Sequence, residues 1–405
     1  MRVALLVAVT LALPAVLALP APAPVPEVLA GFSVAPLAAV AVPTALAFGP
    51  DGDLYATTLA GTVERIHLGW TGAGPVAVGA STFASGFSQP LGLWWVGDVL
   101  LVSDSHAGAE SGRTDGRVSA VVDGERVVVI DGLPAGRHHA NHMREGPDGR
   151  VYLANGNPND AGPNGGPPDV FPYSGAILSF RVDEVLASPA ILRWVDASGA
   201  PIPPGSIAAH PRNADFAQKV HVLAWGFRNV FGIAFGADGT PYTAMNGADV
   251  PSSQDALYRI APGTFYGFPF CFSEGVPGST AVSVVNNPLY PSYDCSAVPP
   301  ADALLGWHVC ATGLDVAPAS WPEGFAGSVF IGECGPFFPE PHAVGVSTHD
   351  AGHKVARVPI GPDGSVGEVH DFLVGLALPT DVLFGPDDAM YVADAEGVLR
   401  VAPLR

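Results

Sequence analysis

The feature that most constrains the fold is a phrase of sequence that returns six times along the chain. Each copy has an apolar run, a turn of the GPDG type or close to it, and a second apolar run that ends in small or acidic residues. The copies begin at Pro43, Pro90, His142, Phe231, Gly313 and Pro379. Each is followed, closely or after an insertion, by a third strand-like run, and these begin at Gly61, Gly116, Gly175, Asp255, His353 and Gly397.

The chemistry of the turn determines how the flanking runs pair. Proline at the second position presets φ for a tight turn, and Asp and Gly complete it, so the two runs are antiparallel neighbours. Placing such small sheets in a ring leaves no long free sheet edge. The sequence therefore predicts an all-β fold, a six-bladed β-propeller of antiparallel four-stranded sheets, formed by one domain over residues 27–405. Two stacked β-sandwiches are the alternative. We expect the long insertions, 157–173, 183–220 and 269–304, to crowd one face.

The composition is typical of a chain rich in turns, and its charge excludes some classes of binding partner. The 405 residues include 49 Gly and 41 Pro, and only 14% are charged. The formal net charge is −20, from 38 acidic and 18 basic residues. Such a surface argues against nucleic acid and anionic lipid as partners. An anionic ligand must then be held by a few placed cations.

The first residues have the pattern of an export signal. One basic residue precedes an apolar run from Val3 to about Leu19, with small residues near its end. We expect residues 1–23 to be a signal peptide with the start of a Pro/Ala linker, and the mature protein to be secreted or periplasmic. A short membrane anchor is the alternative. No later stretch has the length and apolar character of a membrane span, so stable membrane insertion is not expected.

Four cysteines, Cys271, Cys295, Cys310 and Cys334, fall in one quarter of the chain. In an exported protein without zinc-like Cys/His spacing, they favour two disulfides over a metal site. We expect Cys271 to pair with Cys295 and Cys310 with Cys334, because the second pair lies on two neighbouring strand-like runs.

Three histidines stand just before, or at the start of, one predicted inner strand: His138, His139 and His142. Inner strands line the axis of a propeller, and loops at one end hold ligands, so these side chains are expected near a central mouth. They could bind a metal, although ligands four residues apart suit a helix better. Any of them could be a structural histidine. As a third possibility, a neutral imidazole could act as a general base that takes a proton from a hydroxyl.

Two further stretches are candidates for a site. Arg228 is one of few cations and lies beside Asn229, just upstream of another inner strand. A surface salt bridge is the common role of arginine, but its planar guanidinium also suits a carboxylate or a developing oxyanion. Gly247 and Ala248 could offer backbone carbonyls to calcium, which prefers oxygen ligands, or could form only a bend between strands.

Together and in order, these motifs resemble the glucose/sorbosone dehydrogenase family of soluble quinoproteins, including L-sorbosone dehydrogenase-like proteins. Members of that family are six-bladed propellers that carry pyrroloquinoline quinone (PQQ) and calcium. The resemblance covers nearly the whole mature chain. It is carried by PLG at Pro90, HHAN with GPDGRVYLANG, GFRNVFGIAF, DALYRIAPGTFYGFP, WHVCATGLDVAPASWPEGFAGSVFIG, GHKVARV and PTDVLFGPDDAMYVAD. GFRN and APGTFYGFP are the most specific of these.

The resemblance implies roles for individual residues. The family's catalytic histidine lies eight residues before the Gly of GPDG and falls on His138, with His139 as the alternative if the loop shifts by one. The family's Arg-Asn pair at the quinone falls on Arg228 and Asn229. The remaining matches are Gly247 and Ala248 to calcium-binding carbonyls, Trp307 to a ring-stacking tryptophan, and Gln89 to a glutamine that touches the cofactor.

The resemblance also implies a reaction. His138 would remove the hydroxyl proton of a sugar, sugar aldehyde hydrate or related alcohol, a hydride would pass to the quinone, and Arg228 with calcium would stabilise the growing charge. The cofactor supplies the redox chemistry and the protein supplies orientation and electrostatics. An external electron acceptor must then reoxidise PQQ.

Some positions depart from the family, and two other functions are possible. Leu378 and Thr380 stand where the family has basic residues that hold the cofactor's carboxylates, and Ala256 replaces an acidic residue. One rival is a calcium-dependent, lactonase-like hydrolase, which needs carboxylate and Asn side chains on one axial ion. The other is a non-enzymatic binding propeller that has lost the cofactor. The candidate ligands for the hydrolase are Asp394, Asp104 and Asn246.

Overall fold

The computed structural model describes residues 26–159, 172–248, 253–335 and 352–404. The predicted signal peptide, residues 1–23, lies outside the described residues. Within the described ranges, no helix has the length and apolar character needed to cross a membrane.

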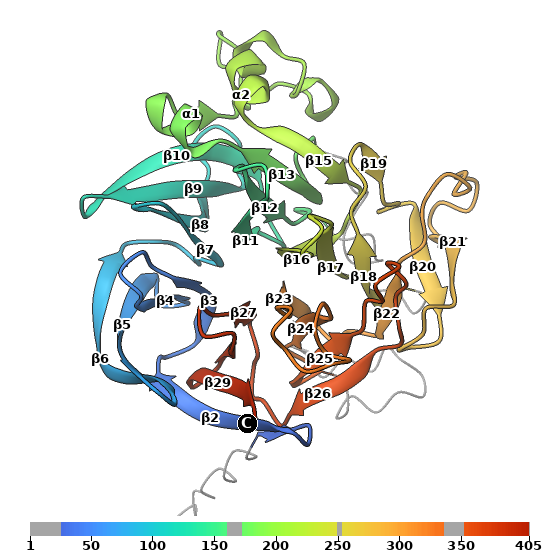
Figure 1. Cartoon of the computed structure of the whole chain (residues 1–405). Helices are drawn as coiled ribbons and strands as arrows, with labels where there is room; N and C mark the ends of the chain where they lie inside the picture. Colours follow the sequence, from blue (N-terminus) through green and yellow to red (C-terminus); the bar gives the residue numbers. More distant parts are fainter. Residues whose placement is uncertain (1–25, 160–171, 249–252, 336–351, 405) are drawn as a thin grey trace, which may run out of the picture.

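Six small antiparallel sheets stand around a central axis, as the sequence predicts (Figure 1). We number the blades 1 to 6 by their inner strands. Each inner strand starts within two residues of the start of one copy of the repeated phrase. The inner strands are β3 (Pro43–Phe48), β7 (Gly92–Val96), β11 (Ala140–Glu145), β16 (Asn229–Phe235), β23 (Ala311–Val316) and β27 (Asp381–Phe384).

The second and third strands follow the turns and third runs of the repeat. The second strands are β4 (Leu54–Thr58), β8 (Val99–Ala107), β12 (Val151–Asn155), β17 (Pro241–Asn246), β24 (Val329–Glu333) and β28 (Met390–Asp394). The third strands are β5 (Thr62–Thr71), β9 (Thr114–Val122), β13 (Ala176–Phe180), β18 (Asp255–Arg259), β25 (Lys354–Val358) and β29 (Gly397–Pro403).

A fourth strand closes each blade on the outside, and blades 2, 3 and 5 gain a short fifth strand. The fourth strands are β6 (Gly74–Ser85), β10 (Glu125–Pro134), β15 (His221–Trp225), β22 (Ala303–Gly306), β26 (His370–Val374) and β2 (Phe32–Ala39). The fifth strands are β14 (Ala190–Ile191), β19 (Thr264–Phe265) and β1 (Glu27–Val28). The four-stranded prediction therefore holds for the main body of every blade.

The two ends of the chain close the ring together. Strand β2, near the N-terminal end, pairs antiparallel with the C-terminal strand β29, with Phe32 opposite Pro403 and Val34 opposite Val401. Strand β1 pairs with β26 of the neighbouring blade 5. Segments from both ends thus complete one sheet, and every blade is held between two others.

Neighbouring blades pack closely through their inner strands. An apolar cluster joins Tyr152 and Ile177 of blade 3 to Val230 and Ile233 of blade 4. Near the axis the strands come closer still: a Cβ on Gly92 would lie 2.2 Å from the carbonyl oxygen of Asn141 in the next blade. Only glycine fits at such a position without moving the backbone of the next blade.

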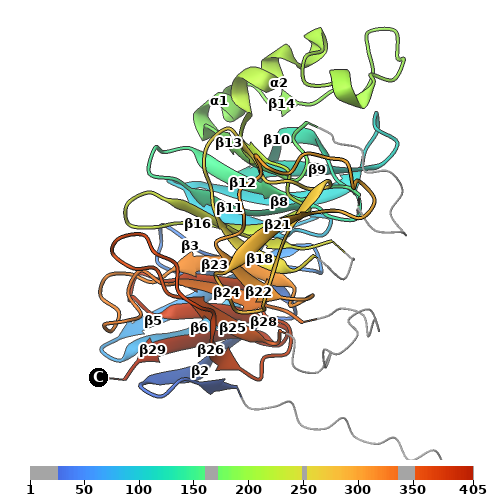
Figure 2. The same cartoon turned by 90° about the vertical axis from the view of Figure 1, so that its right-hand side faces the viewer.

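The insertions at 183–220 and 269–304 lie on the outer rim (Figures 1 and 2), so the prediction that they crowd one face is wrong. The first contains α1 (Val182–Ala187), the 3-10 turns η1 (Pro204–Ser206) and η2 (Pro211–Asn213), and α2 (Ala214–Lys219). Its buried Val185 and Phe216 share a core with Ile130 of β10, which explains the rim position. The second contains the hairpin of β20 (Cys271–Gly275) and β21 (Val282–Asn286). Most of the insertion at 157–173 lies outside the described residues.

Both predicted disulfides are confirmed. Cys271 bonds to Cys295 and Cys310 bonds to Cys334, with Cα separations of 5.9 and 5.1 Å. The first ties the hairpin β20–β21 to the segment that follows it. The second joins the start of β23 to the end of β24 within blade 5.

Candidate active site in the axial cavity

A cavity of about 660 Å³ opens on the axis at the end where the inner strands begin. Its size lies within the range of small-molecule and cofactor sites. All six blades contribute to its wall through Thr44, Leu91, Asn141, Asn229, Thr312 and Thr380, in blade order. The propeller therefore brings residues from distant parts of the chain to one central site.

His138 lies in the wall of this cavity and is only 8% exposed. Its Nδ1 lies 2.6 Å from the carbonyl oxygen of Asn157. Because a carbonyl only accepts hydrogen bonds, Nδ1 must carry the proton, and Nε2 is then the basic nitrogen of the neutral ring. The hydrogen bond thus fixes the tautomer of the neutral ring, with its acceptor nitrogen at Nε2.

The three histidines do not form a common metal site. His139 also lines the cavity, and burial lowers the pKa of its imidazole. His142 is buried elsewhere: its Nε2 donates to the carbonyl of Thr44 at 3.0 Å, and its Nδ1 lies 3.3 Å from Asp381. His142 therefore fits the structural interpretation. Across the described ranges, no group of three or more His, Cys, Asp or Glu side chains has a metal-binding arrangement.

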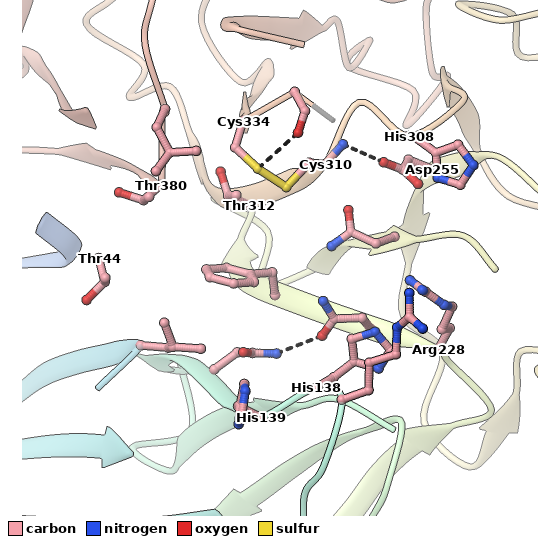
Figure 3. Close-up of a pocket in the computed structure, with 18 of the residues that line it drawn as sticks. Thr44, His138, His139, Arg228, Asp255, His308, Cys310, Thr312, Cys334 and Thr380 are labelled. Carbon is pink, nitrogen blue, oxygen red and sulfur yellow. Dashed lines mark hydrogen bonds between the residues drawn. A yellow bond between two sulfur atoms is a disulfide. The ribbon is translucent and has the colours of Figure 1, made fainter. Parts of the chain in front are cut away.

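Arg228 lies in the cavity wall beside His138 (Figure 3), and Asn229 lines the same cavity. Arg228 precedes β16 directly, and its side chain is 6% exposed. The amide of Asn141 donates to the side-chain oxygen of Asn229 at 3.0 Å and to the carbonyl of Val230 at 2.7 Å. These bonds fix blade 3 against blade 4. The predicted histidine and the predicted Arg-Asn pair therefore meet in one cavity.

The opposite side of this polar region is organised by Asp255, at the start of β18. Its carboxylate accepts hydrogen bonds from the backbone N–H groups of Gly247, at 2.8 Å, and Cys310, at 2.7 Å. Burial raises the pKa of this carboxyl group, and the two N–H groups oppose that rise. Gly247 and the disulfide Cys310–Cys334 line the cavity. The carboxylate thus fixes the loop predicted to hold calcium relative to the disulfide.

Three other predicted site residues do not line the cavity. Gln89, Trp307 and Ala248 are absent from its wall. Gly247, next to Ala248, and His308, next to Trp307, do line it. Their predicted roles stay predictions. The two carboxylates suggested for a lactonase are absent from the wall as well. Asp104 binds Arg117 and Arg126, and Asp394 accepts the N–H groups of Ala377 and Leu378.

The cavity residues that were not among the sequence candidates include Arg137, Phe231, Asp255 and His308. Arg137 had a usable signal, because a cation beside the histidine motif is notable in a chain with a net charge of −20. Phe231 also had one, since it lies on a predicted inner strand. Asp255 and His308 carried none, because only closure of the ring brings them to the axis.

No known family model and no curated protein matches the chain, whereas several solved structures do. A member of carbohydrate-active enzyme family AA12 from Trichoderma reesei has a TM-score of 0.70 at 13% identity, covering 96% of this chain and 100% of that one. The holo PQQ domain of pyranose dehydrogenase from Coprinopsis cinerea has a TM-score of 0.66 at 14% identity, covering 94% and 98%. The PQQ-bound aldose sugar dehydrogenase from Streptomyces coelicolor has a TM-score of 0.58 at 18% identity, covering 93% and 100%.

The chain has the fold of PQQ-binding sugar dehydrogenases. At these identities the structural similarity shows a shared fold and does not show a shared reaction. The chemistry must be inferred from the residues that line the cavity of this chain.

Proposed function

We propose that the protein is an oxidoreductase that binds PQQ in the axial cavity and oxidises an alcohol or hydrated aldehyde group of a sugar or related compound. One observation carries the proposal. His138, oriented through Nδ1, and Arg228 line the same cavity in a fold that PQQ-binding sugar dehydrogenases share.

The charges in the cavity suit PQQ, which is a tricarboxylate. Among the described residues, two arginines, Arg137 and Arg228, and three histidines line the wall, against one carboxylate, Asp255. The chain as a whole carries 38 acidic and 18 basic residues, so cations are concentrated at the axis. Leu378 and Thr380 do line the cavity without charge, as the sequence indicates. Arg137, Arg228 and Asn229 would therefore hold the carboxylates and quinone oxygens.

The same region offers hard oxygen donors that suit calcium. The side-chain amide of Asn246 donates to the carbonyl of Ala311 at 3.0 Å, while its buried Oδ1 has no hydrogen-bond partner. A buried oxygen of this kind normally has a partner. Together with the carbonyls of Gly247 and Ala248, it would hold the ion.

The chain's own residues then divide the work of oxidation. PQQ, when bound, supplies the acceptor for two electrons. His138 takes the hydroxyl proton of the substrate at Nε2, with Asn157 holding the ring in the required tautomer. The guanidinium of Arg228 offers planar donors to developing negative charge, which are most effective in a site screened from water. An external electron acceptor completes the cycle.

The proposed setting is extracellular or periplasmic. Two disulfides are present among the four cysteines, and disulfides persist in oxidising compartments. The predicted signal peptide supports the same location.

The test is reconstitution of the purified protein with PQQ and calcium, followed by dye reduction with a panel of sugars and alcohols. We expect His138→Ala to lower the rate by about 10²–10⁴-fold, as loss of a general base does, while PQQ absorbance shows that the cofactor still binds. The matched control is His221→Asn, an exposed histidine on the outer strand β15, which should leave the rate unchanged. Absence of PQQ binding would favour a binding propeller, and lactone turnover with calcium alone would favour the hydrolase.

A further inference from the structure

The axial cavity has two chemically different sides (Figure 3). His138, Arg228, Asp255 and His308 lie on the side formed by blades 3 to 5. The wall formed by blades 6, 1 and 2 carries no ionisable side chain within the part of the chain that the structure describes. That wall consists of Val42, Thr44, Leu59, Leu91, Leu378 and Thr380.

The two threonines of this wall do not offer a proton to a ligand. The Thr44 hydroxyl donates to the carbonyl of Pro90 at 2.7 Å, and the Thr380 hydroxyl donates to the carbonyl of Pro43, also at 2.7 Å. Each hydroxyl has a single proton, and both protons are engaged by backbone. A polyhydroxylated group against this wall would lose hydrogen bonds to water and could regain only those that its own hydroxyls donate to the two threonine oxygens, which is unfavourable.

Val42 adds a second, independent observation. Its backbone has φ of 46°, in the left-handed region, where a β-branched residue is an outlier. Two hydrogen bonds hold it there: its N–H donates to Ala395 at 2.9 Å, and its carbonyl accepts from the N–H of Leu59 at 3.2 Å. Glycine or asparagine would relax the backbone, but would remove the apolar side chain from the cavity wall. Strain held in this way is typical of functional positions.

Leu59 continues the apolar wall to the mouth of the cavity. Its side chain lines the cavity and yet is 51% exposed. An apolar side chain at the entrance gains free energy only when a ligand covers it.

We propose that Val42, Leu59, Leu91 and Leu378 form an apolar subsite that selects substrates with a hydrophobic group. The preferred substrate is then an alcohol, hydrated aldehyde or glycoside that bears an alkyl or aryl group, in place of a free sugar. The reaction itself rests on the proposed function, whereas the subsite rests only on the cavity wall.

Binding to the cofactor-free protein tests the subsite alone. Hexanoate and gluconate are six-carbon monocarboxylates that differ in the hydroxyl groups of the chain, so calorimetry with both compares an apolar with a polar body on the same anion. We expect hexanoate to bind at least tenfold more tightly. Val42→Gly should weaken hexanoate about five- to thirtyfold, the loss of an isopropyl contact, with little change for gluconate. Because glycine relieves the strained φ, the melting temperature should hold or rise.

Two more variants test whether the effect belongs to the cavity wall. Leu91→Asn should lower hexanoate affinity as Val42→Gly does, whereas Leu289→Asn, at an exposed leucine outside the cavity, should not. Equal affinities for the two carboxylates, or an equal effect of Val42→Gly on both, would overturn the subsite.

Activity of the PQQ- and calcium-loaded protein separates the subsite from the proposed function. We expect hexan-1-ol to be oxidised faster than glucose at equal concentration. Val42→Gly should reduce the ratio of these two oxidation rates. Oxidation of glucose as fast as hexan-1-ol would retain the dehydrogenase and overturn the subsite's role in selection. A preference for hexanoate without oxidation of any alcohol would retain the subsite and reject the dehydrogenase.

Discussion

At the scale of single residues, Glu333 is the most unusual group outside the cavity. It ends β24 in blade 5, its side chain is fully buried, and neither carboxylate oxygen has a hydrogen-bond partner. The ammonium of Lys354 lies 3.6 Å away and is shared with Asp371. Burial raises the pKa of Glu333 to about 8, with Lys354 opposing that rise and Asp255 and Asp371 adding to it. Near neutral pH this carboxyl group is therefore protonated.

This raised pKa makes the free energy of unfolding depend on pH. The folded protein binds a proton at Glu333 that the unfolded chain releases above its ordinary pKa of 4.5, so stability falls as pH rises from about 4.5 to about 8. Glu333→Gln mimics the protonated group. We expect the variant to match the wild type at pH 5 and to exceed it by about 1–3 kcal/mol at pH 8.5, measured by urea unfolding. A loss of similar size at both pH values would show that the carboxylate is ionised and held by Lys354.

Only some residues of the site could be placed at the axis from the sequence. His138 and Arg228 could be placed because each stands just before an inner strand, and the starts of inner strands meet at the axis of a propeller. Asp255 and His308 could not be placed in this way. Their positions depend on a third strand and on an irregular loop, whose approach to the axis follows from packing between blades.

At the scale of elements, the two disulfides form a natural comparison. Each joins cysteines 24 residues apart, so each restricts the unfolded chain to the same extent. Only Cys310–Cys334 lines the cavity, where the N–H of Cys310 holds Asp255. The loop before it is strained, with His308 at φ of 52° and Cys310 at 60°.

This comparison yields a prediction about the polar side of the cavity. We expect the Cys310→Ser/Cys334→Ser and Cys271→Ser/Cys295→Ser variants each to lose about 2–4 kcal/mol of unfolding free energy. PQQ affinity should fall only in the first, because its strained loop can relax and release Asp255. Calorimetric titration with PQQ in the presence of calcium measures the difference. Equal affinities for the two variants would mean that the disulfide does not position this side of the cavity.

Strands were more predictable than insertions for a physical reason. A turn such as GPDG sets both the position and the direction of its flanking strands locally, so the inner strands begin within two residues of the repeated phrase. An insertion is placed by whichever surface accepts its apolar residues. Val185 and Phe216 pack beside the outer strand β10, and nothing in their local sequence distinguishes that surface from the face of the ring.

At the scale of the whole molecule, stability depends on how the ring closes. Five blades draw their four main strands in chain order from one stretch of sequence, with insertions in blades 3 and 4, whereas blade 6 combines β2 from the N-terminal side with β27, β28 and β29. Opening this single seam would expose the edge of β29 and separate blade 6 from blade 1. Since residues of all six blades line the cavity, separation of β2 from β29 would also disrupt the site.

A disulfide across the seam tests this view. Ser33 and Ala402 are directly opposite on β2 and β29, and the Ser33 hydroxyl donates to the Ala402 carbonyl at 3.3 Å. Opposed residues of antiparallel strands have Cα atoms about 4.5–5.5 Å apart, which suits a disulfide. The bond would close a loop spanning 369 residues, so we expect Ser33→Cys/Ala402→Cys to raise Tm by about 3–6 °C over either single variant. If mass spectrometry shows the bond and calorimetry shows no rise, unfolding begins between other blades, and the seam is not the weak point of the ring.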